Sequence, residues 1–434
     1  MINILLEVIF VKKIKVLVAL LLSFATIFPT FTTTAHAADK VKVTFWHAMN
    51  GDHAAKLTEL VQAFNASQDK YEVEESSQGN YKALQQSVMA SAASGSLPTM
   101  TQLTASSLSG FITEGLLAPL DDVLKEENGF TSELKSDIYP GFLQGVTVND
   151  KIYALPFAKS VRVMYVNKDI LEKVGKEAPK TCQDVKDLAA AMKEKGIDVP
   201  AIGLENGLSM EVETMARQNG AAWVSEDLKT VDLTSDKAME PVQFIKDLVK
   251  DGAARLAGED KYMSGPFAAG KSAVYIGSSA GLPFVLKGVE ESKINIGTEV
   301  VPTFGEGKQM TLLAGNDLGV FDDASDEQKA GAVAFMSFLL QPENTSKWAA
   351  ATGYLPVTKR GTESDNWKNY LKENPLAEAA TKELEFGYST AIYDGSGKVY
   401  SDSELAFENI IVKDADIKAE MEKLQELIKG FLHL

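Results

Sequence analysis

Residue types that usually carry catalysis are few in this 434-residue chain, and they lack the spacing that common reactions need. Only three of the four histidines, His47, His53 and His433, lie beyond the N-terminal segment. No H-E-x-x-H pair occurs, and no G-x-G-x-x-G follows a predicted strand. Cys182 is the single cysteine, which excludes an intrachain disulfide and a metal site built from several cysteines. We therefore expect no catalytic residues, no metal and no cofactor.

The composition points to a globular protein rather than a nucleic-acid or membrane-surface binder. Hydrophobic residues make up 45% and charged residues 24% of the chain, and its length is sufficient for two domains. The formal net charge is -17. Nucleic acids and anionic membranes attract basic surfaces, so neither is expected as the main partner.

The first residues have the organisation of an export signal. Lys12, Lys13 and Lys15 precede an apolar run over residues 16–28, and an A-x-A pattern follows at residues 35–37. The run is too short for a comfortable transmembrane span. We predict a cleaved signal peptide over residues 1–37, with translation starting near Val11. No cysteine lies just after the run, so we expect an exported, extracytoplasmic protein, in the periplasm or at the cell surface, without a lipid anchor.

The elements that would position a site begin with residues 41–81. Apolar residues alternate with polar ones over 41–45, which predicts a strand with one buried face. Turn residues 49–52 then supply a capping side chain for a helix. One face of that helix is apolar, at Leu57, Leu60, Val61 and Phe64. A second strand over 71–75 and a loop at 79–81 follow. Such a unit brings a loop to the carboxyl edge of a parallel sheet, where open α/β sheets bind ligands.

Strands and helices alternate along the rest of the chain, which predicts parallel sheets covered by helices on both faces. We expect a strand over 151–157 that Pro156 ends, and another over 161–166. Separate strands are predicted at 312–313 and 318–321, and one last helix over about 404–431. Ser106 is placed to cap a helix, and capping boxes begin helices after Thr181 and after Ser325.

Three short blocks carry a family resemblance: FWH at residues 45–47, GNY at 79–81 and TGYLP at 352–356. With these blocks the chain resembles the extracytoplasmic solute-binding proteins of ABC importers, over about residues 40 to 430. Within that family it most resembles the branch that binds sn-glycerol-3-phosphate and related glycerophosphodiesters. The wider family also binds maltodextrins and other sugars.

The resemblance implies an α/β fold of two lobes, the type II periplasmic-binding-protein (Venus-flytrap) architecture, in which each lobe is a mostly parallel sheet flanked by helices. The chain would cross between the lobes three times, so that each lobe is discontinuous. The N-terminal lobe would comprise residues 38–158 and 311–356. The C-terminal lobe would comprise residues 159–310 and 357–434.

The resemblance also implies which residues contact a ligand in the cleft between the lobes. A cleft of this kind needs aromatic faces, close backbone approach and a few fixed polar groups, and a phosphate also favours a cation. The positions that match are Tyr81, Ser160, Ser278, Gly315, Tyr354 and Lys398. Trp46 lies near the expected cleft and is added to them, although core packing would also explain it.

Two positions depart from the glycerol-phosphate pattern. Lys398 stands where close relatives have an arginine, so the charge is kept but the bidentate fork is lost. Ala105 stands where they have a glutamate that meets the glycerol hydroxyls. These departures leave room for a larger diester or a sugar.

The sequence therefore predicts the binding subunit of an ABC importer, a monomer that closes on a small ligand and delivers it to a membrane permease. The first ligand hypothesis is sn-glycerol-3-phosphate or a glycerophosphodiester. The second is a sugar or oligosaccharide bound by the same fold. A third hypothesis, from a different class, is an exported glycan-degrading enzyme.

Overall fold

The computed structural model describes residues 40–434 apart from residue 306. The predicted signal peptide and start near Val11 lie outside the described residues. Within the described part of the chain, no helix is both long enough and apolar enough to cross a membrane.

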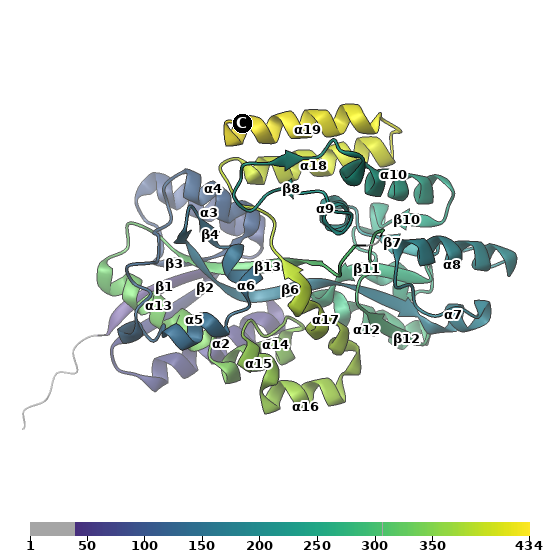
Figure 1. Ribbon diagram of the computed structural model, residues 1–434. Helices are drawn as coiled ribbons and strands as arrows, with labels where there is room; N and C mark the ends of the chain where they lie inside the picture. Colours follow the sequence, from purple (N-terminus) through teal and green to yellow (C-terminus); the bar gives the residue numbers. More distant parts are fainter. Residues whose placement is uncertain (1–39, 306) are drawn as a thin grey trace, which may run out of the picture. The chain divides into compact units, whose positions relative to one another are not determined.

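The first elements follow the predicted strand–helix–strand order (Figure 1). They are β1 (Val41–His47), α2 (Gly51–Ser67), β2 (Tyr71–Ser77), α3 (Tyr81–Ser94), β3 (Met100–Thr104) and α4 (Ala105–Thr113). The buried residues of α2 are the four predicted ones, Leu57, Leu60, Val61 and Phe64. Strand β1 pairs in parallel with β2 and β3, so α2 covers a parallel sheet with its apolar face.

Ten strands form one hydrogen-bonded sheet in which two parallel groups meet at two long antiparallel strands. Its main path runs β10-β7-β11-β6-β13-β3-β1-β2. The long strands are β6 (Ala154–Asn167) and β13 (Thr311–Val320), which pair with each other in the middle (Figure 1). The parallel group beyond β6 contains β7 (Ile202–Leu204), β10 (Ala254–Leu256) and β11 (Val274–Ser278), whereas β12 (Ile296–Glu299) pairs antiparallel with β6 itself.

Pro156 does not end a strand, and this prediction was wrong. Strand β6 continues through it, and all of its residues are buried. Over residues 154–161 the strand pairs with β13, whereas β11 and β12 join it over residues 162–167. At Pro156, β6 is therefore paired with a named strand, β13, along only one of its two edges. The register shifts beside it, so Phe157 is an extra residue between the partners of Asn316 and Asp317. Proline is tolerated at such one-sided, bulged positions.

The two short strands predicted at 312–313 and 318–321 are one strand. Residues 314–317 lie between them in β13, where each has a partner on β6. Gly315 interrupts the apolar pattern in the sequence but continues the ladder. A third segment joins the same place, because the Leu355 amide donates to the Lys159 carbonyl at 2.9 Å.

Helix caps agree with the sequence in two places and differ in two. Thr181 begins α8 (Cys182–Glu194) and Ser325 begins α13 (Asp326–Leu339), each with a complete capping box. At α4 the cap is Thr104, paired with Ser107, rather than Ser106. At α2 the Asn50 side chain caps nothing, because its amide bonds the carbonyls of Ala48 and Gly79.

The predicted last helix is two helices. They are α18 (Ser396–Ile411) and α19 (Ile417–Leu432), which pack against each other (Figure 1). Asp414 adopts a left-handed φ of 60°, and the Asp416 side chain accepts from the Ala419 amide at 2.8 Å to cap α19. The break lies where the chain must turn back on itself.

The other elements cover the sheet or connect its strands. They are α5 (Ser132–Asp137), α6 (Pro140–Gln144), β4 (Thr147–Val148), β5 (Lys151–Ile152), α7 (Lys168–Val174), α9 (Ser209–Gln218), β8 (Trp223–Val224), β9 (Val231–Asp232), α10 (Asp236–Lys250), α11 (Ser264–Ala268), α12 (Leu282–Ser292), α14 (Pro342–Thr352), α15 (Lys359–Glu363), α16 (Asp365–Glu373), α17 (Glu378–Glu383) and β14 (Gly387–Tyr388), with 3-10 turns η1 (Glu126–Asn128), η2 (Gly258–Asp260), η3 (Ser279–Gly281), η4 (Pro375–Ala377) and η5 (Leu384–Phe386).

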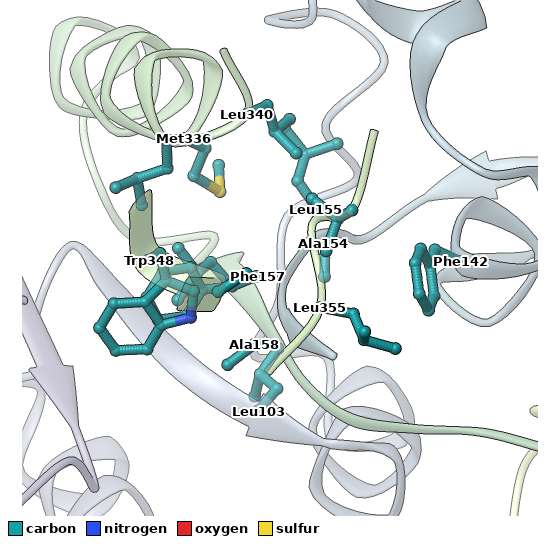
Figure 2. Packing of buried hydrophobic residues seen from close by; sticks show 14 of the residues in the cluster. Leu103, Phe142, Ala154, Leu155, Phe157, Ala158, Met336, Leu340, Trp348 and Leu355 are labelled. Carbon is teal, nitrogen blue, oxygen red and sulfur yellow. The ribbon is translucent and has the colours of Figure 1, made fainter. Parts of the chain in front are cut away.

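Buried side chains form two hydrophobic clusters. One contains residues of β1, β3, β13 and α13, and the other contains residues of β7, α8, α10 and α19. Figure 2 shows part of the first, where Phe157 of β6 stacks on Trp348 of α14 with ring centroids 4.6 Å apart. The lobe boundaries at residues 158, 310 and 356 stay a prediction.

Candidate functional site

Three segments far apart in the sequence bring two tyrosines to one place. Tyr81 is the first residue of α3, and Tyr354 follows α14. Between them lies Asn316 of β13, whose Nδ2 donates to the Tyr81 hydroxyl at 2.8 Å. Asn316 is fully buried, and its Oδ1 accepts from the amide of Gln102, on β3, at 2.6 Å. We call these four residues, Tyr81, Tyr354, Asn316 and Gln102, the tyrosine–amide cluster.

The environment keeps both tyrosine hydroxyls protonated. The Tyr81 side chain is 40% exposed as a whole, but its oxygen points toward Asn316. Burial of that end, together with the neighbouring Tyr354, raises the pKa of Tyr81 far above 10.0. Burial also raises the pKa of Tyr354, although Tyr81 and Asn316 oppose the change. Each hydroxyl is thus a donor as well as an acceptor at neutral pH.

Tyr354 is held by the aromatic residues beneath it. Its ring is nearly parallel to that of Trp348, at 8° with centroids 6.2 Å apart, and His53 packs beside it at 5.7 Å. Gly353, with a φ of 78°, ends α14 and turns the chain so that Tyr354 leaves the helix. The packing fixes the ring, so the hydroxyl occupies a defined position.

Gly315 lies directly beside the cluster and has a backbone that requires glycine. Its φ is +111°, and a Cβ there would stand 2.2 Å from the Ala158 carbonyl oxygen. The residue itself is exposed, so its peptide is open to an approaching molecule. The expected backbone approach at Gly315 is compatible with this geometry, and contact with a ligand stays a prediction.

Ser160 lies on β6, and Ser278 lies on the neighbouring strand β11. Ser160 is buried on β6 opposite Ala314 of β13. Ser278 ends β11, and its hydroxyl accepts from the Ala280 amide at 3.2 Å, so it caps η3. The next residue, Ser279, accepts from the Val161 amide at 3.2 Å and lines a small cavity with Tyr354. The fold thus joins this serine region to the tyrosines.

Lys398 is not held in the tyrosine–amide cluster. It belongs to the first turn of α18, where its Nζ bonds the Asp402 carboxylate at 2.6 Å and its side chain is 59% exposed. The adjoining Gly397 lies against the backbone of Ser106 at the start of α4. Lys398 and the exposed Ala105 therefore belong to the same neighbourhood, although a surface ion pair occupies the lysine.

Trp46 packs, half buried, against the first hydrophobic cluster from β1. Its carbonyl accepts from the Thr101 hydroxyl at 3.3 Å. Within residues 40–434, no hydrogen bond or ring contact joins Trp46 to the tyrosine–amide cluster. Its role in a site stays a prediction.

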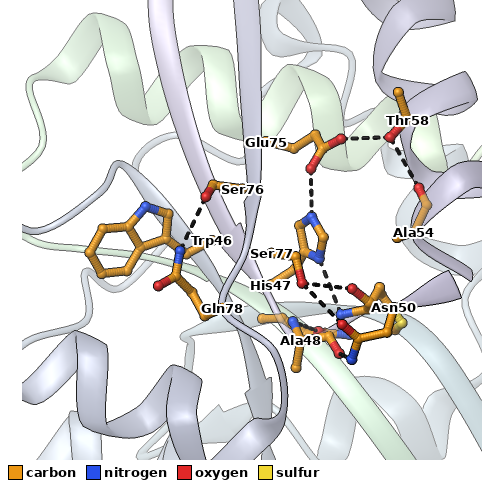
Figure 3. A network of polar contacts seen from close by, with 12 residues as sticks. Trp46, His47, Ala48, Asn50, Ala54, Thr58, Glu75, Ser76, Ser77 and Gln78 are labelled. Carbon is orange, nitrogen blue, oxygen red and sulfur yellow. Dashed lines mark hydrogen bonds and ion pairs between the residues drawn. The ribbon is translucent and has the colours of Figure 1, made fainter.

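The neighbouring His47 superficially resembles part of a catalytic relay but has no free nitrogen (Figure 3). His47 Nε2 bonds Glu75 at 2.7 Å, and Nδ1 accepts from the Met49 amide at 3.1 Å. Because Nδ1 accepts a hydrogen bond, the ring proton is on Nε2, which donates a hydrogen bond to Glu75. Burial raises the pKa of Glu75, but the bonds from His47 and Thr58 outweigh it and lower that pKa. The pair cannot act as a general base.

Two short stretches fit catalytic patterns that reading the sequence missed. Residues 265–272, GPFAAGKS, have the spacing G-x-x-x-x-G-K-S of a phosphate-binding loop. That loop connects a strand to a following helix. Here the order is reversed, since the first part is helix α11 and Ser272 precedes strand β11. The lysine and serine do not begin a helix, so the pattern does not form a phosphate loop.

Residues 277–281, GSSAG, have the spacing of a nucleophile elbow. A serine nucleophile there needs a histidine within hydrogen-bonding reach. The Ser279 hydroxyl instead accepts from the Val161 amide, and no hydrogen bond joins it to a histidine in the described part of the chain. These residues end β11 and form η3, directly before α12, and do not form a catalytic arrangement.

Comparison with known proteins decides the family. A profile described as bacterial extracellular solute-binding protein matches residues 59–375. The chain belongs to this family. Its members are exported substrate-binding proteins of ABC importers rather than enzymes, so it binds a small molecule and works with a membrane permease.

Relatives and solved structures agree with this assignment. The sn-glycerol-3-phosphate-binding periplasmic protein UgpB of Escherichia coli is 26% identical over 367 residues, covering 81% of this chain and 82% of UgpB. The cyclic alpha-maltosyl-1,6-maltose binding protein of Arthrobacter globiformis superposes with a TM-score of 0.79 at 19% identity, covering 91% and 99% of the two chains. UgpB of Mycobacterium tuberculosis, in complex with glycerophosphocholine, gives 0.77 at 22% identity, covering 90% and 98%.

These similarities confirm the predicted fold class, a two-lobe α/β binding protein, here with one large, mostly parallel sheet flanked by helices. They do not identify the ligand, because structures of a sugar-binding and a glycerophosphocholine-binding protein superpose with similar TM-scores of 0.79 and 0.77. Sequence reasoning also missed Asn316 and Gln102. Asn316 follows the noted Gly315, but a buried amide pair 214 residues apart leaves no local signal.

Proposed function

We propose that this protein captures sn-glycerol-3-phosphate or a glycerophosphodiester between two lobes and delivers it to the permease. The observation that carries the proposal is the convergence of Tyr81, Tyr354 and Gly315, with Ser160 close by on β6. They come from separate segments and correspond to ligand-contacting positions of the glycerol-phosphate branch. The 26% identical E. coli relative is named for this ligand.

Lys398 is the proposed partner of the phosphate. Its present bond to Asp402 is an exposed ion pair, which is worth only about 0–1 kcal/mol. The phosphate monoester of glycerol-3-phosphate carries more charge than one carboxylate and would compete for the ammonium group. The phosphate of a glycerophosphodiester carries one negative charge, like the carboxylate, and would compete on equal terms. The first turn of α18 would add partially positive backbone amides at the same place.

Closure of the lobes is the proposed mechanism. If the lobes divide as predicted, α4 belongs to one of them and residues 393–394 to the other. The Ser109 hydroxyl donates to the Tyr393 carbonyl at 2.9 Å, and the Thr113 hydroxyl donates to Asp394 at 2.8 Å. These bonds would form only on closure, and a ligand that bridges the lobes would favour the state in which they exist.

A sugar or oligosaccharide is the second candidate. Ala105 offers no carboxylate for glycerol hydroxyls, and the positive charge of Lys398 is already paired with Asp402. The Arthrobacter globiformis neighbour is named for binding a maltose derivative. A neutral polyhydroxyl ligand would use the tyrosines without needing the lysine.

Calorimetry on the mature chain with glycerol-3-phosphate, glycerophosphocholine and maltose would test the proposal. Lys398→Ala should weaken phosphate ligands at least about tenfold, which corresponds to about 1.4 kcal/mol. Lys418→Ala is the matched control, because Lys418 makes the same i,i+4 pair with Glu422 on α19. Binding of maltose alone, unaffected by Lys398→Ala, would contradict the glycerol-phosphate assignment.

A further inference from the structure

A line of three hydrogen bonds leads from the backbone just after β1 to the tyrosines. The Ala48 amide donates to Gln102 Oε1 at 2.8 Å. Gln102 Nε2 donates to Asn316 Oδ1 at 2.6 Å, and Asn316 Nδ2 donates to the Tyr81 oxygen at 2.8 Å. Asn316 is 0% and Gln102 is 2% exposed. Each step therefore takes place inside the protein.

The direction of every bond in this line is determined by its first member. A backbone N–H can only donate, so it selects the oxygen end of the Gln102 amide. The nitrogen end of Gln102 then faces Asn316 and selects its oxygen. The nitrogen of Asn316 is left to face Tyr81 and must donate to its oxygen.

We infer that Asn316 is a specificity-determining residue that makes the Tyr81–Tyr354 pair a hydrogen-bond donor toward the ligand. This inference rests on the proposed binding function. Because the Tyr81 oxygen accepts from inside, its proton points away from Asn316, toward Tyr354 or the cleft. The pair can then donate one hydrogen bond outward, to a ligand atom with a free lone pair. A phosphate oxygen or a sugar oxygen fits this chemistry, whereas an ammonium group does not.

The burial around the cluster supports this role. The pKa values of Tyr81 and Tyr354 are raised by burial, so neither hydroxyl loses the proton that it would donate. Stacking on Trp348 fixes the ring of Tyr354 and therefore the direction of its hydroxyl. A purely structural link between the residue after β1, strand β3 and strand β13 would not require its last bond to end on a half-exposed tyrosine.

The sharpest test is to reverse the direction of the hydrogen bond between residue 316 and Tyr81. In Asn316→Asp the side chain can only accept, so it keeps the Gln102 bond but draws the Tyr81 proton inward. In Gln102→Glu the Ala48 bond is kept, and Asn316 must rotate its amide and accept from Tyr81. Both variants should bind glycerophosphocholine, or maltose if that is the ligand, at least about tenfold more weakly by calorimetry.

Asn65→Asp is the matched control. Asn65 makes a similar pair of bonds to the Val73 backbone at 2.9 and 2.8 Å, near the C-terminal end of α2, and neither bond involves the tyrosine–amide cluster. It should lose thermal stability but keep its affinity within about twofold. Unchanged affinity in a folded Asn316→Asp protein would overturn the inference.

A double-mutant cycle covers the case in which a buried carboxylate prevents folding. Asn316→Ala should weaken binding in the natural protein but cause no further loss in a Tyr81→Phe background, because the amide acts through that hydroxyl. Equal losses in both backgrounds would show a merely structural role and overturn the inference.

A measurement without ligand separates this inference from the proposed function. With 13Cζ-labelled tyrosine, the Tyr81 resonance, assigned with Tyr81→Phe, should move in Asn316→Ala and stay in place in Asn65→Asp. Suppose that the Tyr81 resonance moves but the natural protein binds neither glycerophosphocholine nor maltose. The proposed ligands are then wrong, whereas the inferred direction of the hydrogen bond from Asn316 to Tyr81 is supported. If the resonance does not move, this direction is not set by Asn316.

Discussion

Gly315→Ala should destabilise the protein although the position is exposed. A φ of +111° is one that alanine rarely adopts, and holding it there costs about 1–3 kcal/mol. The new Cβ would stand 2.2 Å from the Ala158 oxygen and 2.9 Å from the Lys159 Cα. Both are backbone atoms, so β13 and β6 must separate and weaken a ladder bond worth about 1 kcal/mol. The expected loss is about 2–4 kcal/mol.

Thermal unfolding followed by circular dichroism would measure this loss. With an unfolding entropy of about 2.1 cal/mol/K per residue, a chain of about 400 residues changes its midpoint by roughly 1.2 °C per kcal/mol. Gly315→Ala should thus unfold about 2–5 °C lower. It should also bind ligand more weakly, because the neighbouring Asn316 shifts with β13.

Gly110→Ala is the control with the opposite sign. Gly110 lies within α4, and a Cβ there meets nothing within 4 Å. Alanine is favoured over glycine by about 1 kcal/mol inside a helix, so the midpoint should rise by about 1 °C. A Gly315→Ala protein as stable as the natural one would refute the argument from backbone geometry.

Two further predictions concern buried acidic groups. Burial raises the pKa of Glu383 from 4.5 to about 7, so between those values the unfolded chain loses a proton that the folded protein keeps. That group therefore lowers the free energy of unfolding by about 3 kcal/mol as the pH rises from about 4 to about 8. In Glu383→Gln this pH-dependent loss should be absent in urea titrations at the two pH values, and a parallel decline in both proteins would contradict the prediction. Burial also raises the pKa of the Cys182 thiol to about 12, so a thiol reagent at about pH 8 should label it only after unfolding. Rapid labelling of the folded protein would show that the thiol is accessible.

Local features of this fold were predictable from the sequence. The buried face of α2 and the capping boxes at Thr181 and Ser325 agree with the structure, because each depends on residues within one or two helical turns. The family resemblance added the fold class and the positions of Tyr81, Tyr354 and Gly315. The break between α18 and α19 had a local signal, the capping Asp416, that was overlooked.

Other features depended on partners that the sequence does not mark. Pro156 continues a strand because β6 is bonded on one side there, and the pieces of β13 join because residues 314–317 find partners on β6. His47 cannot act as a base because its two ring nitrogens are hydrogen-bonded to Glu75 and to the Met49 amide. Such outcomes follow from sheet register, which is set by long-range packing.

The sequence by itself determined the local elements and, through its family blocks, the kind of protein. Only the tertiary structure decided which polar groups face one another. Gln102 and Asn316 are 214 residues apart, and their bond exists because β3 and β13 are adjacent strands in one register. A side chain's own type fixes what it can donate or accept, whereas the folded sheet determines which partner stands opposite and therefore what the tyrosines present to a ligand.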